Sequence, residues 1–138
     1  MHKVRNACAD HSYALPKFAP IAFAVFLAEN GDLANWKTPR MRAGAVGGAM
    51  DLAAGARNVI VMMFHTTKDG QAKLLRSCTY PLTARGCVSW IVTNLALIQV
   101  DQVGFLLREL APGVSVDDVR SATAAPLRIA PDLRKMEC

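Results

Sequence analysis

The chain has 138 residues, of which 52% are hydrophobic and 20% charged, and this balance is typical of a folded domain and excludes a disordered segment. A length of this order is enough for one hydrophobic core. The net charge is +5, but the basic residues are scattered and no aromatic residues interleave with them, which argues against a nucleic-acid partner. A small phosphate-bearing ligand fits this modest basicity equally well.

The cysteines Cys8, Cys78, Cys87 and Cys138 form no Cys-x-x-Cys pair, which indicates free thiols in a reducing compartment. Cys8 and His11 have ligand-like spacing, but two ligands do not make a zinc site, so no metal is expected. The apolar stretch 18–27 is too short to span a bilayer, and no signal peptide is evident. We therefore expect a soluble cytoplasmic protein without a membrane partner.

The first half of the chain predicts two buried strands. Residues 1–18 show no periodicity and are interpreted as loop or frayed terminus. Residues 21–27 form a short continuous apolar run, which suits a buried strand, and Asn30-Gly31-Asp32 supplies turn chemistry after it. Residues 58–64 give the clearest strand, apolar on both faces, as in a parallel sheet that is covered on both sides.

The second half alternates between helical and strand patterns. In residues 88–95 the apolar positions fall at i, i+3, i+4 and i+7, which predicts an amphipathic helix. Residues 96–100 and 105–110 predict two strands of a hairpin, joined by a turn at 101–104. Ser115 and Asp118 have the spacing of a capping box, which predicts a helix over 116–122. Strands interleaved with helices indicate an open α/β sheet.

Gly44, Gly47 and Gly48 stand just before an Ala-rich helix candidate at residues 50–56. Glycines here would let an anionic ligand approach backbone amides at a helix N-terminus. The alternative is a tight turn with a close contact between helix and strand. The spacing is not that of a dinucleotide-binding fingerprint, and no Lys-Ser or Lys-Thr pair follows, which excludes a P-loop.

Several longer stretches resemble the B (beta) subunit of the 3-oxoacid coenzyme A-transferases, which act on acetoacetate or 3-oxoadipate. These stretches are residues 29–36 (Glu-Asn-Gly-Asp-Leu-Ala-Asn-Trp), 47–51 (Gly-Gly-Ala-Met-Asp), 58–63 (Asn-Val-Ile-Val-Met-Met), 65–70 (His-Thr-Thr-Lys-Asp-Gly), 78–83 (Cys-Thr-Tyr-Pro-Leu-Thr) and 109–114 (Glu-Leu-Ala-Pro-Gly-Val). The resemblance covers residues 21–131 and leaves a segment 1–20 and a tail 132–138 unmatched. It implies an α/β fold with an open, mostly parallel sheet and flanking helices, incomplete at its N-terminal side.

The resemblance implies the transfer of coenzyme A from succinyl-CoA to a 3-oxoacid, with the coenzyme A thioester as a substrate and no permanently bound cofactor. It also implies a hetero-oligomer with an A subunit. Gly47, Gly48 and Ala49 would line the cleft near the thioester end of coenzyme A. Residues 45–51, 61–63 and 78–83 look closest to the 3-oxoadipate type, whereas residues 65–70 are shared with the acetoacetate enzymes.

In this family a glutamate attacks the acyl-CoA and carries a covalent intermediate. It belongs to a Ser-Glu-Asn-Gly motif followed by Leu or Ile, Leu and Gly. Glu29 stands in a similar Ala-Glu-Asn-Gly sequence, but the residues that follow match a later, non-catalytic segment. We therefore interpret Glu29 as an exposed loop carboxylate. Glu109 and Glu137 have no matching context, so the nucleophile is expected to be absent from these 138 residues.

Three hypotheses follow. The chain is part of a coenzyme A-transferase, or it is a catalytically inactive, truncated subunit that serves only for assembly. The third hypothesis, an unrelated small α/β binding domain, requires all the motif matches to be coincidental.

Other reactive side chains have two interpretations each. His65 follows a strong strand, where open α/β sheets place ligands, and it could be a general base or a structural residue. Phe64 precedes it, where many relatives carry an acidic residue. Lys68 could contact a phosphate or be a solvated turn lysine. Cys78 and Cys87 are interpreted as packed apolar residues and not as reactive thiols.

Overall fold

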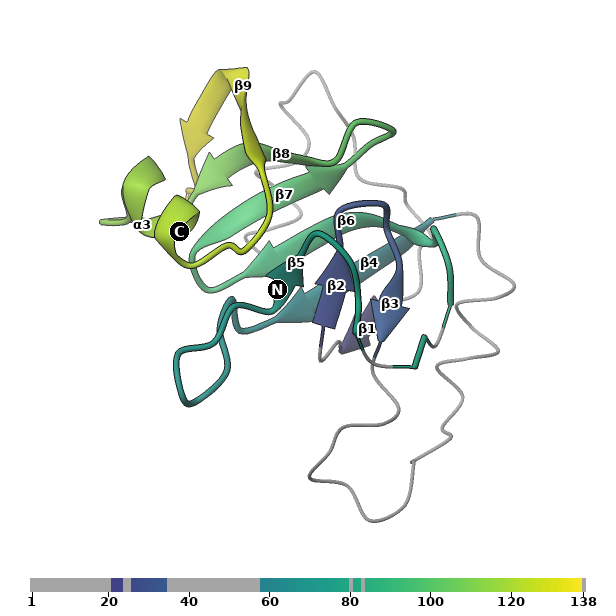
Figure 1. The fold of residues 1–138 in the computed structure, drawn as a ribbon. Coiled ribbons are helices and arrows are strands. Elements are labelled where there is room, and N and C mark those ends of the chain that lie inside the picture. Colours follow the sequence, from purple (N-terminus) through teal and green to yellow (C-terminus); the bar gives the residue numbers. More distant parts are fainter. Residues whose placement is uncertain (1–20, 24–25, 35–57, 80, 83, 138) are drawn as a thin grey trace.

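The computed structural model describes residues 21–23, 26–34, 58–79, 81–82 and 84–137, which form two sheets and a short helix, α3 (Val116–Ser121) (Figure 1). The larger sheet has the strand order β1-β4-β6-β7-β8-β9. Its strands are β1 (Ile21–Phe23), β4 (Val59–Met63), β6 (Val88–Thr93), β7 (Ala96–Val100), β8 (Phe105–Leu110) and β9 (Leu127–Lys135). The smaller sheet has the order β3-β2-β5, with strands β3 (Leu33–Ala34), β2 (Phe26–Ala28) and β5 (Leu74–Leu75).

The larger sheet is mixed. Strands β1, β4 and β6 run parallel to one another, and β9 runs parallel to β8. Strands β6, β7 and β8 form an antiparallel meander in the middle. Parallel pairing thus dominates, as expected, and the architecture agrees with the α/β class. Within the described ranges, however, α3 alone represents the flanking helices that the resemblance implies.

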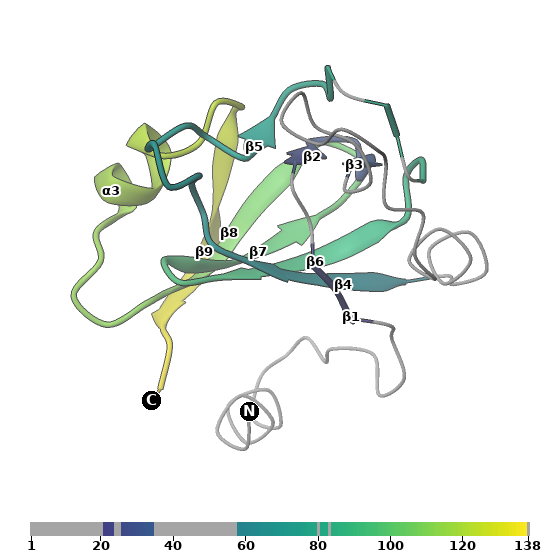
Figure 2. The same cartoon turned by 90° about the horizontal axis from the view of Figure 1, so that it is seen from below.

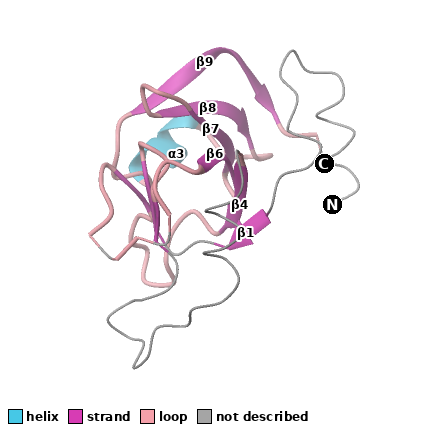
Figure 3. Cartoon of the chain, turned by 90° about the vertical axis from the view of Figure 1, so that its right-hand side faces the viewer, coloured by secondary structure: helices cyan, strands magenta, loops and turns pink. Residues whose placement is uncertain are grey.

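The hydrophobic core lies between the two sheets. Val61, Ile91, Ile98 and Leu107 lie on one face of the larger sheet, because β4, β6, β7 and β8 pair in that register, and all four are fully buried. Figure 2 shows the smaller sheet and α3 on the same side of the larger sheet, and Figure 3 shows α3 on its concave side. These elements close the core with the buried side chains of Leu27, Leu33, Leu74 and Val119.

Several predicted elements are confirmed. Strand β4 lies between β1 and β6, and β7 and β8 form the expected hairpin. Helix α3 begins with the predicted capping box: the Asp118 N–H donates to Ser115 Oγ at 3.2 Å, and the Ser115 N–H donates to Asp118 Oδ2 at 2.9 Å. The helix ends at Ser121, because Ala122 is already its C-terminal cap.

The helix predicted over residues 88–95 is wrong, since this segment forms strand β6. Its apolar spacing matched a helical stripe because β6 is a central strand, with buried residues on both faces, including Val88, Trp90 and Ile91. The segment is also rich in β-branched and aromatic residues, which favour strands. A short apolar run of this kind fits both periods, and packing decides between them.

Two other boundaries differ from expectation. Residues 21–27 are expected as one strand, but β1 belongs to the larger sheet and β2 to the smaller one. Strand β9 was not expected from the sequence, and it runs through residues 131–132, where the C-terminal tail is expected to begin. Its register slips between Leu107↔Ile129 and Glu109↔Arg134, so a bulge that contains Pro131 hides the strand pattern. The expectations for residues 1–20 and for a helix at 50–56 lie outside the described residues.

The position of the core predicts that two single substitutions, one inside it and one on the surface, lower the free energy of unfolding by very different amounts. Ile91 is 0% exposed and lies in the centre of the core, so Ile91→Ala should lower the free energy of unfolding by about 2–5 kcal/mol. Val103 is 73% exposed, and Val103→Ala should change the free energy of unfolding by less than about 0.5 kcal/mol. Urea denaturation of both variants measures the difference, and equal losses would contradict the assigned core.

Candidate functional site

The segment that contains Glu29 is a closed turn between β2 and β3. The Gly31 N–H donates to the Ala28 carbonyl at 2.9 Å, and the Ala28 N–H donates to the Asp32 carbonyl at 3.0 Å. The Asp32 N–H donates to Asn30 Oδ1 at 3.1 Å, which is the hydrogen bond of an Asx-turn. Gly31 has φ +84°, a conformation that a side chain disfavours. The turn predicted at residues 30–32 is thus confirmed.

This turn is fixed to the start of β6. The Gly31 carbonyl accepts the N–H groups of Cys87 at 3.1 Å and Val88 at 3.2 Å. Asp32 Oδ1 accepts the Gly86 N–H at 2.9 Å. A Cβ atom on Gly31 would lie only 3.0 Å from the Val88 carbonyl oxygen, so the close approach itself requires glycine. The turn therefore connects the smaller sheet to the larger one.

Glu29 lies inside this arrangement. Its N–H donates to the Leu75 carbonyl at 3.0 Å, and the residue is half-buried, which is more enclosed than the exposed loop carboxylate that the sequence suggests. A Cβ atom on Gly104 would lie 3.7 Å from Glu29 Cβ and 3.8 Å from Glu29 Oε2. The Glu29 side chain thus packs over the turn between β7 and β8.

The β7–β8 turn is itself well held. Asp101 Oδ1 accepts the N–H groups of Val103 at 2.8 Å and Gly104 at 3.1 Å, and it also accepts a hydrogen bond from Arg128 on β9. The hydrogen bond from Arg128, more than any other contact, lowers the pKa of the Asp101 carboxyl below its usual range. Glu29 therefore rests on a turn that is tied to the last strand of the sheet.

His65 lies at the carboxyl ends of β4 and β6, the second place where the sequence points to chemistry. The imidazole is 1% exposed, and burial lowers its pKa to about 4. Its backbone N–H donates to Asn94 Oδ1 at 2.9 Å. Its ring nitrogens Nδ1 and Nε2 each lie 2.9 Å from a hydroxyl, of Thr93 and Thr123 respectively.

The neighbouring hydrogen bonds assign the tautomer of His65. Thr93 Oγ1 accepts the N–H groups of Leu95 and Ala96, both at 3.1 Å, and its own hydrogen has two acceptors within reach, Nδ1 of His65 at 2.9 Å and the Ala96 carbonyl at 3.3 Å, of which Nδ1 is the nearer. The proton of the neutral ring therefore sits on Nε2 and is donated to Thr123 Oγ1. The Thr123 hydroxyl in turn donates to the Val119 carbonyl at 2.8 Å. Because both ring nitrogens are engaged, these contacts favour the structural interpretation of His65 over a general base.

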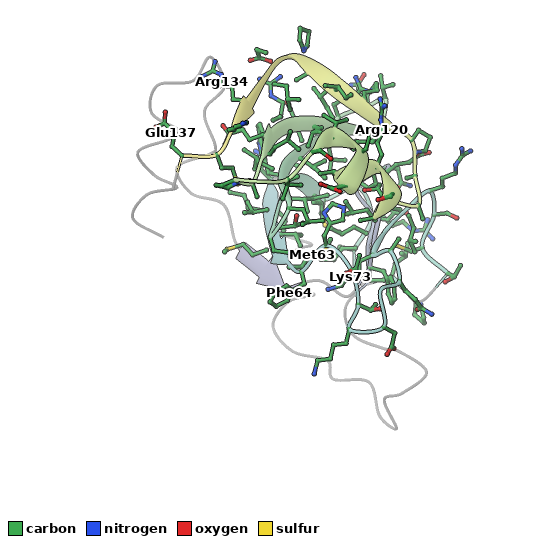
Figure 4. The ribbon with its side chains drawn as sticks, turned by 90° about the vertical axis from the view of Figure 1, so that its left-hand side faces the viewer. Met63, Phe64, Lys73, Arg120, Arg134 and Glu137 are labelled. Carbon is green, nitrogen blue, oxygen red and sulfur yellow. The ribbon has the colours of Figure 1, made fainter. Side chains whose placement is uncertain are left out.

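The exposed part of this edge carries Phe64, which is 74% exposed, at the end of β4 (Figure 4). Lys68 is exposed in the turn closed by the Thr67 and Gln71 backbone groups, which supports its interpretation as a solvated turn lysine. Lys73 is half-buried, and burial lowers the pKa of its ammonium group. A hydrophobic ring and a partly desolvated cation thus lie on the segments next to His65.

The two described thiols are poor nucleophiles. Burial, with a smaller effect from the Asp32 carboxylate, raises the pKa of Cys78 to about 11, and burial also raises the pKa of Cys87. Their interpretation as packed apolar residues is therefore supported.

The described residues bring together no group of three His, Cys, Asp or Glu side chains that could hold a metal ion. Nor does the described part of the chain contain a helix that is both long and apolar enough to cross a membrane.

Gly47, Gly48 and Ala49, the residues expected to line a coenzyme A cleft, lie outside the described residues, and their role stays a prediction. The two described features are the Glu29 turn and the His65 edge. No hydrogen bond among the described residues joins one to the other directly.

The chain matches the family model for coenzyme A transferase over residues 22–122. It is 44% identical over 106 residues to the beta subunit of a probable coenzyme A transferase of Bacillus subtilis, covering 77% of this chain and 49% of that protein. It is 49% identical over 98 residues to the B subunit of a 3-oxoadipate CoA-transferase of Pseudomonas putida, covering 70% of this chain and 46% of that protein. The chain thus spans about half the length of these bacterial relatives.

Solved structures share the fold. An acyl-CoA transferase of Escherichia coli O157:H7 superposes with a TM-score of 0.73 at 20% identity, covering 85% of this chain and 27% of that one. Glutaconate coenzyme A-transferase of Acidaminococcus fermentans gives a TM-score of 0.66 at 18% identity, covering 85% and 52%. The two-sheet arrangement is therefore that of the transferases.

The docked turn predicts unequal effects of two glycine substitutions with similar backbone angles. Gly31 and Gly70 have φ values of +84° and +82°, but a Cβ atom meets the Val88 carbonyl only at Gly31, whereas nothing lies within 4 Å at Gly70. Gly70→Ala should cost about 1–2 kcal/mol of unfolding free energy for the backbone conformation alone. Gly31→Ala should cost at least about 1 kcal/mol more, because β6 must move. Chemical denaturation measures both, and equal costs would rule out the close contact.

Proposed function

The chain belongs to the coenzyme A transferase family, and on that premise we propose that it is part of an enzyme that transfers coenzyme A from succinyl-CoA to a 3-oxoacid. The observation that carries this proposal is the match over residues 22–122, together with relatives named as B or beta subunits. One of them, from Helicobacter pylori, is the B subunit of a succinyl-CoA:3-ketoacid coenzyme A transferase, 38% identical over 122 residues.

The proposed reaction proceeds through an enzyme carboxylate. This carboxylate attacks the thioester carbonyl of succinyl-CoA and expels the coenzyme A thiolate, which leaves a mixed anhydride. The thiolate then attacks the enzyme's own acyl carbon, so that succinate leaves and an enzyme–coenzyme A thioester remains. The carboxylate of the 3-oxoacid repeats these steps in reverse and leaves as the new acyl-CoA.

None of the three glutamates of the chain supplies that carboxylate in our proposal. Glu29 packs over the β7–β8 turn and belongs to a segment that is hydrogen-bonded on both sides. Glu109 is 4% exposed within β8, opposite Arg134 of β9. Glu137 follows β9 and has no sequence context of the family's nucleophile. The chain contributes the scaffold next to the reacting centre, and the nucleophile comes from a segment other than these.

The glycine turn contributes to the binding of the acyl-CoA. Gly47, Gly48 and Ala49 line the cleft near the thioester, where backbone N–H groups can stabilise the oxyanion that develops during acyl transfer. This assignment rests on the resemblance of residues 47–51 to the family motif. Coenzyme A is a substrate in this scheme, and no cofactor is bound permanently.

The preferred acceptor is 3-oxoadipate, and acetoacetate is the second choice. The support is the 49% identity to the 3-oxoadipate enzyme of Pseudomonas putida, against 41% over 116 residues to a mouse mitochondrial succinyl-CoA:3-ketoacid transferase. We further propose that the chain assembles with an A-type subunit in the cytoplasm. The support for assembly is the subunit designation of the bacterial relatives.

The alternative is a catalytically inactive module that retains only the contacts for assembly. It is favoured by the scaffold roles of Glu29, which packs over the β7–β8 turn, and of Glu109, which is 4% exposed within β8. In this alternative the fold and the contacts with the other subunit are retained, but no acyl transfer occurs.

Reconstitution with a partner subunit distinguishes an active transferase subunit from a catalytically inactive module. The purified chain is mixed with an A subunit of a 3-oxoadipate transferase, succinyl-CoA and either 3-oxoadipate or acetoacetate, and the formation of the new acyl-CoA is followed. If transfer occurs, it should be faster with 3-oxoadipate, and Glu29→Gln should retain it within about twofold, because a neutral isostere preserves the packing of the turn. Asp69→Asn, an exposed turn carboxylate, is the matched control.

A stable complex without any transfer would favour the inactive module. Transfer that falls by several orders of magnitude in Glu29→Gln, but not in Asp69→Asn, would show that Glu29 is the nucleophile and overturn the proposal.

A further inference from the structure

Helix α3 is held to the rest of the molecule by few anchors. It spans six residues, Val116–Ser121, and Val119 is its one buried residue. A helix of this length is not stable alone, so its stability must come from tertiary contacts. Val116 is partly buried against the same core, and after the helix the Ala124 N–H donates to the Leu74 carbonyl at 3.0 Å and Thr123 Oγ1 lies 2.9 Å from His65 Nε2.

The contact between His65 and Thr123 joins distant parts of the chain. It links the end of β4 to the segment that leaves α3, and through Thr93 the same imidazole is bonded to the end of β6. The Thr123 hydroxyl then donates to the Val119 carbonyl within the helix. One neutral ring thus connects α3, on the concave side of the sheet in Figure 3, with the carboxyl ends of two parallel strands.

We propose that His65 and Thr123 form a latch that holds α3 closed on the sheet, and that protonation of His65 opens α3 as a local unit. The proton enters from solvent at Nδ1, so the imidazolium carries a hydrogen on each ring nitrogen. Thr93 Oγ1 then faces a third donor in addition to the N–H groups of Leu95 and Ala96, and its hydroxyl must turn to the Ala96 carbonyl at 3.3 Å. Opening of α3 removes Thr123 from Nε2 and uncovers the ring, so water can then solvate a cation that the closed site surrounds only with hydroxyl groups.

The direct hydrogen-bond partners of the imidazole are uncharged, and the charged groups on the neighbouring segments are exposed or half-buried. Both hydrogen-bond partners of the ring are uncharged hydroxyls, and residues 93–96 of β6 and its turn contain no titratable group. On α3, Asp117, Asp118 and Arg120 are all exposed. On the segment after β4, Lys68 and Asp69 are exposed and Lys73 is half-buried.

The pH window follows from the two states of the latch. In the closed state burial lowers the pKa of His65 to about 4, whereas in the open state it returns to its usual value near 6.5. The open state therefore binds more protons between these values, and opening becomes easier as the pH falls. Hydrogen bonds with Ser115 lower the pKa of Asp118, so the capping box of α3 stays intact in this window.

Amide hydrogen exchange of the full chain tests the latch. The amides of Val119 and Ala122 donate to the carbonyls of Ser115, the N-cap of α3, and Asp118, and their protection factors should fall about 20-fold from about pH 7 to about pH 5. The amide of Ile98, in the centre of β7, should keep its protection and serves as the internal control. In His65→Gln the side chain can still donate and accept but cannot be protonated, so the pH dependence at α3 should disappear.

Two further measurements keep the test decisive if His65→Gln does not fold. Thr123→Val removes the hydroxyl at similar volume, and it should lower the protection of α3 at both pH values while Ile98 is unaffected. Nitrogen-15 chemical shifts at neutral pH should show a protonated Nε2 and an unprotonated Nδ1. Protection of α3 that does not depend on pH, an equal pH dependence in His65→Gln, or a proton on Nδ1 would overturn the latch. None of these readouts depends on transferase activity.

Discussion

The described structure depends on the docking of one turn onto the start of a strand. The Gly31 carbonyl accepts two consecutive amides of the larger sheet, and the Asp32 carboxylate accepts a third, so the smaller sheet is held in place above the core. The distance leaves no space for a side chain at Gly31. With this turn docked, Leu27 and Leu33 are brought onto the buried face of the larger sheet.

The same docking decides how the chemistry of the chain is interpreted. Glu29 resembles a catalytic glutamate in its immediate sequence, but it belongs to the docked turn and packs over Gly104. Both nitrogens of His65 are engaged by hydroxyls, and the thiols of Cys78 and Cys87 have raised pKa values. The described residues therefore offer a scaffold without an activated nucleophile, which fits our proposal that the reacting carboxylate comes from elsewhere in the transferase.

Sequence reasoning predicted what local chemistry determines. The capping box of Ser115, the β7–β8 hairpin and the strand β4 all follow from patterns within a few residues, and the family follows from long motifs. Strand β6 was predicted as a helix because a central strand buries both faces. Its apolar residues therefore do not show the two-residue alternation that distinguishes a strand from a helix. Strand β9 was not predicted, because the bulge around Pro131 interrupts its alternation. The hydroxyl partners of His65 come from positions 28 and 58 residues away, which sequence spacing cannot indicate.

The most direct test of the scaffold role is the intact mass of this chain during turnover. The chain is incubated with an A subunit and succinyl-CoA, quenched with acid, and measured by mass spectrometry, followed by peptide mapping of any modified species. We expect this polypeptide to keep its unmodified mass. A covalent coenzyme A adduct that maps to Glu29 would contradict the scaffold role, since a carboxylate that only packs against a turn cannot form a thioester.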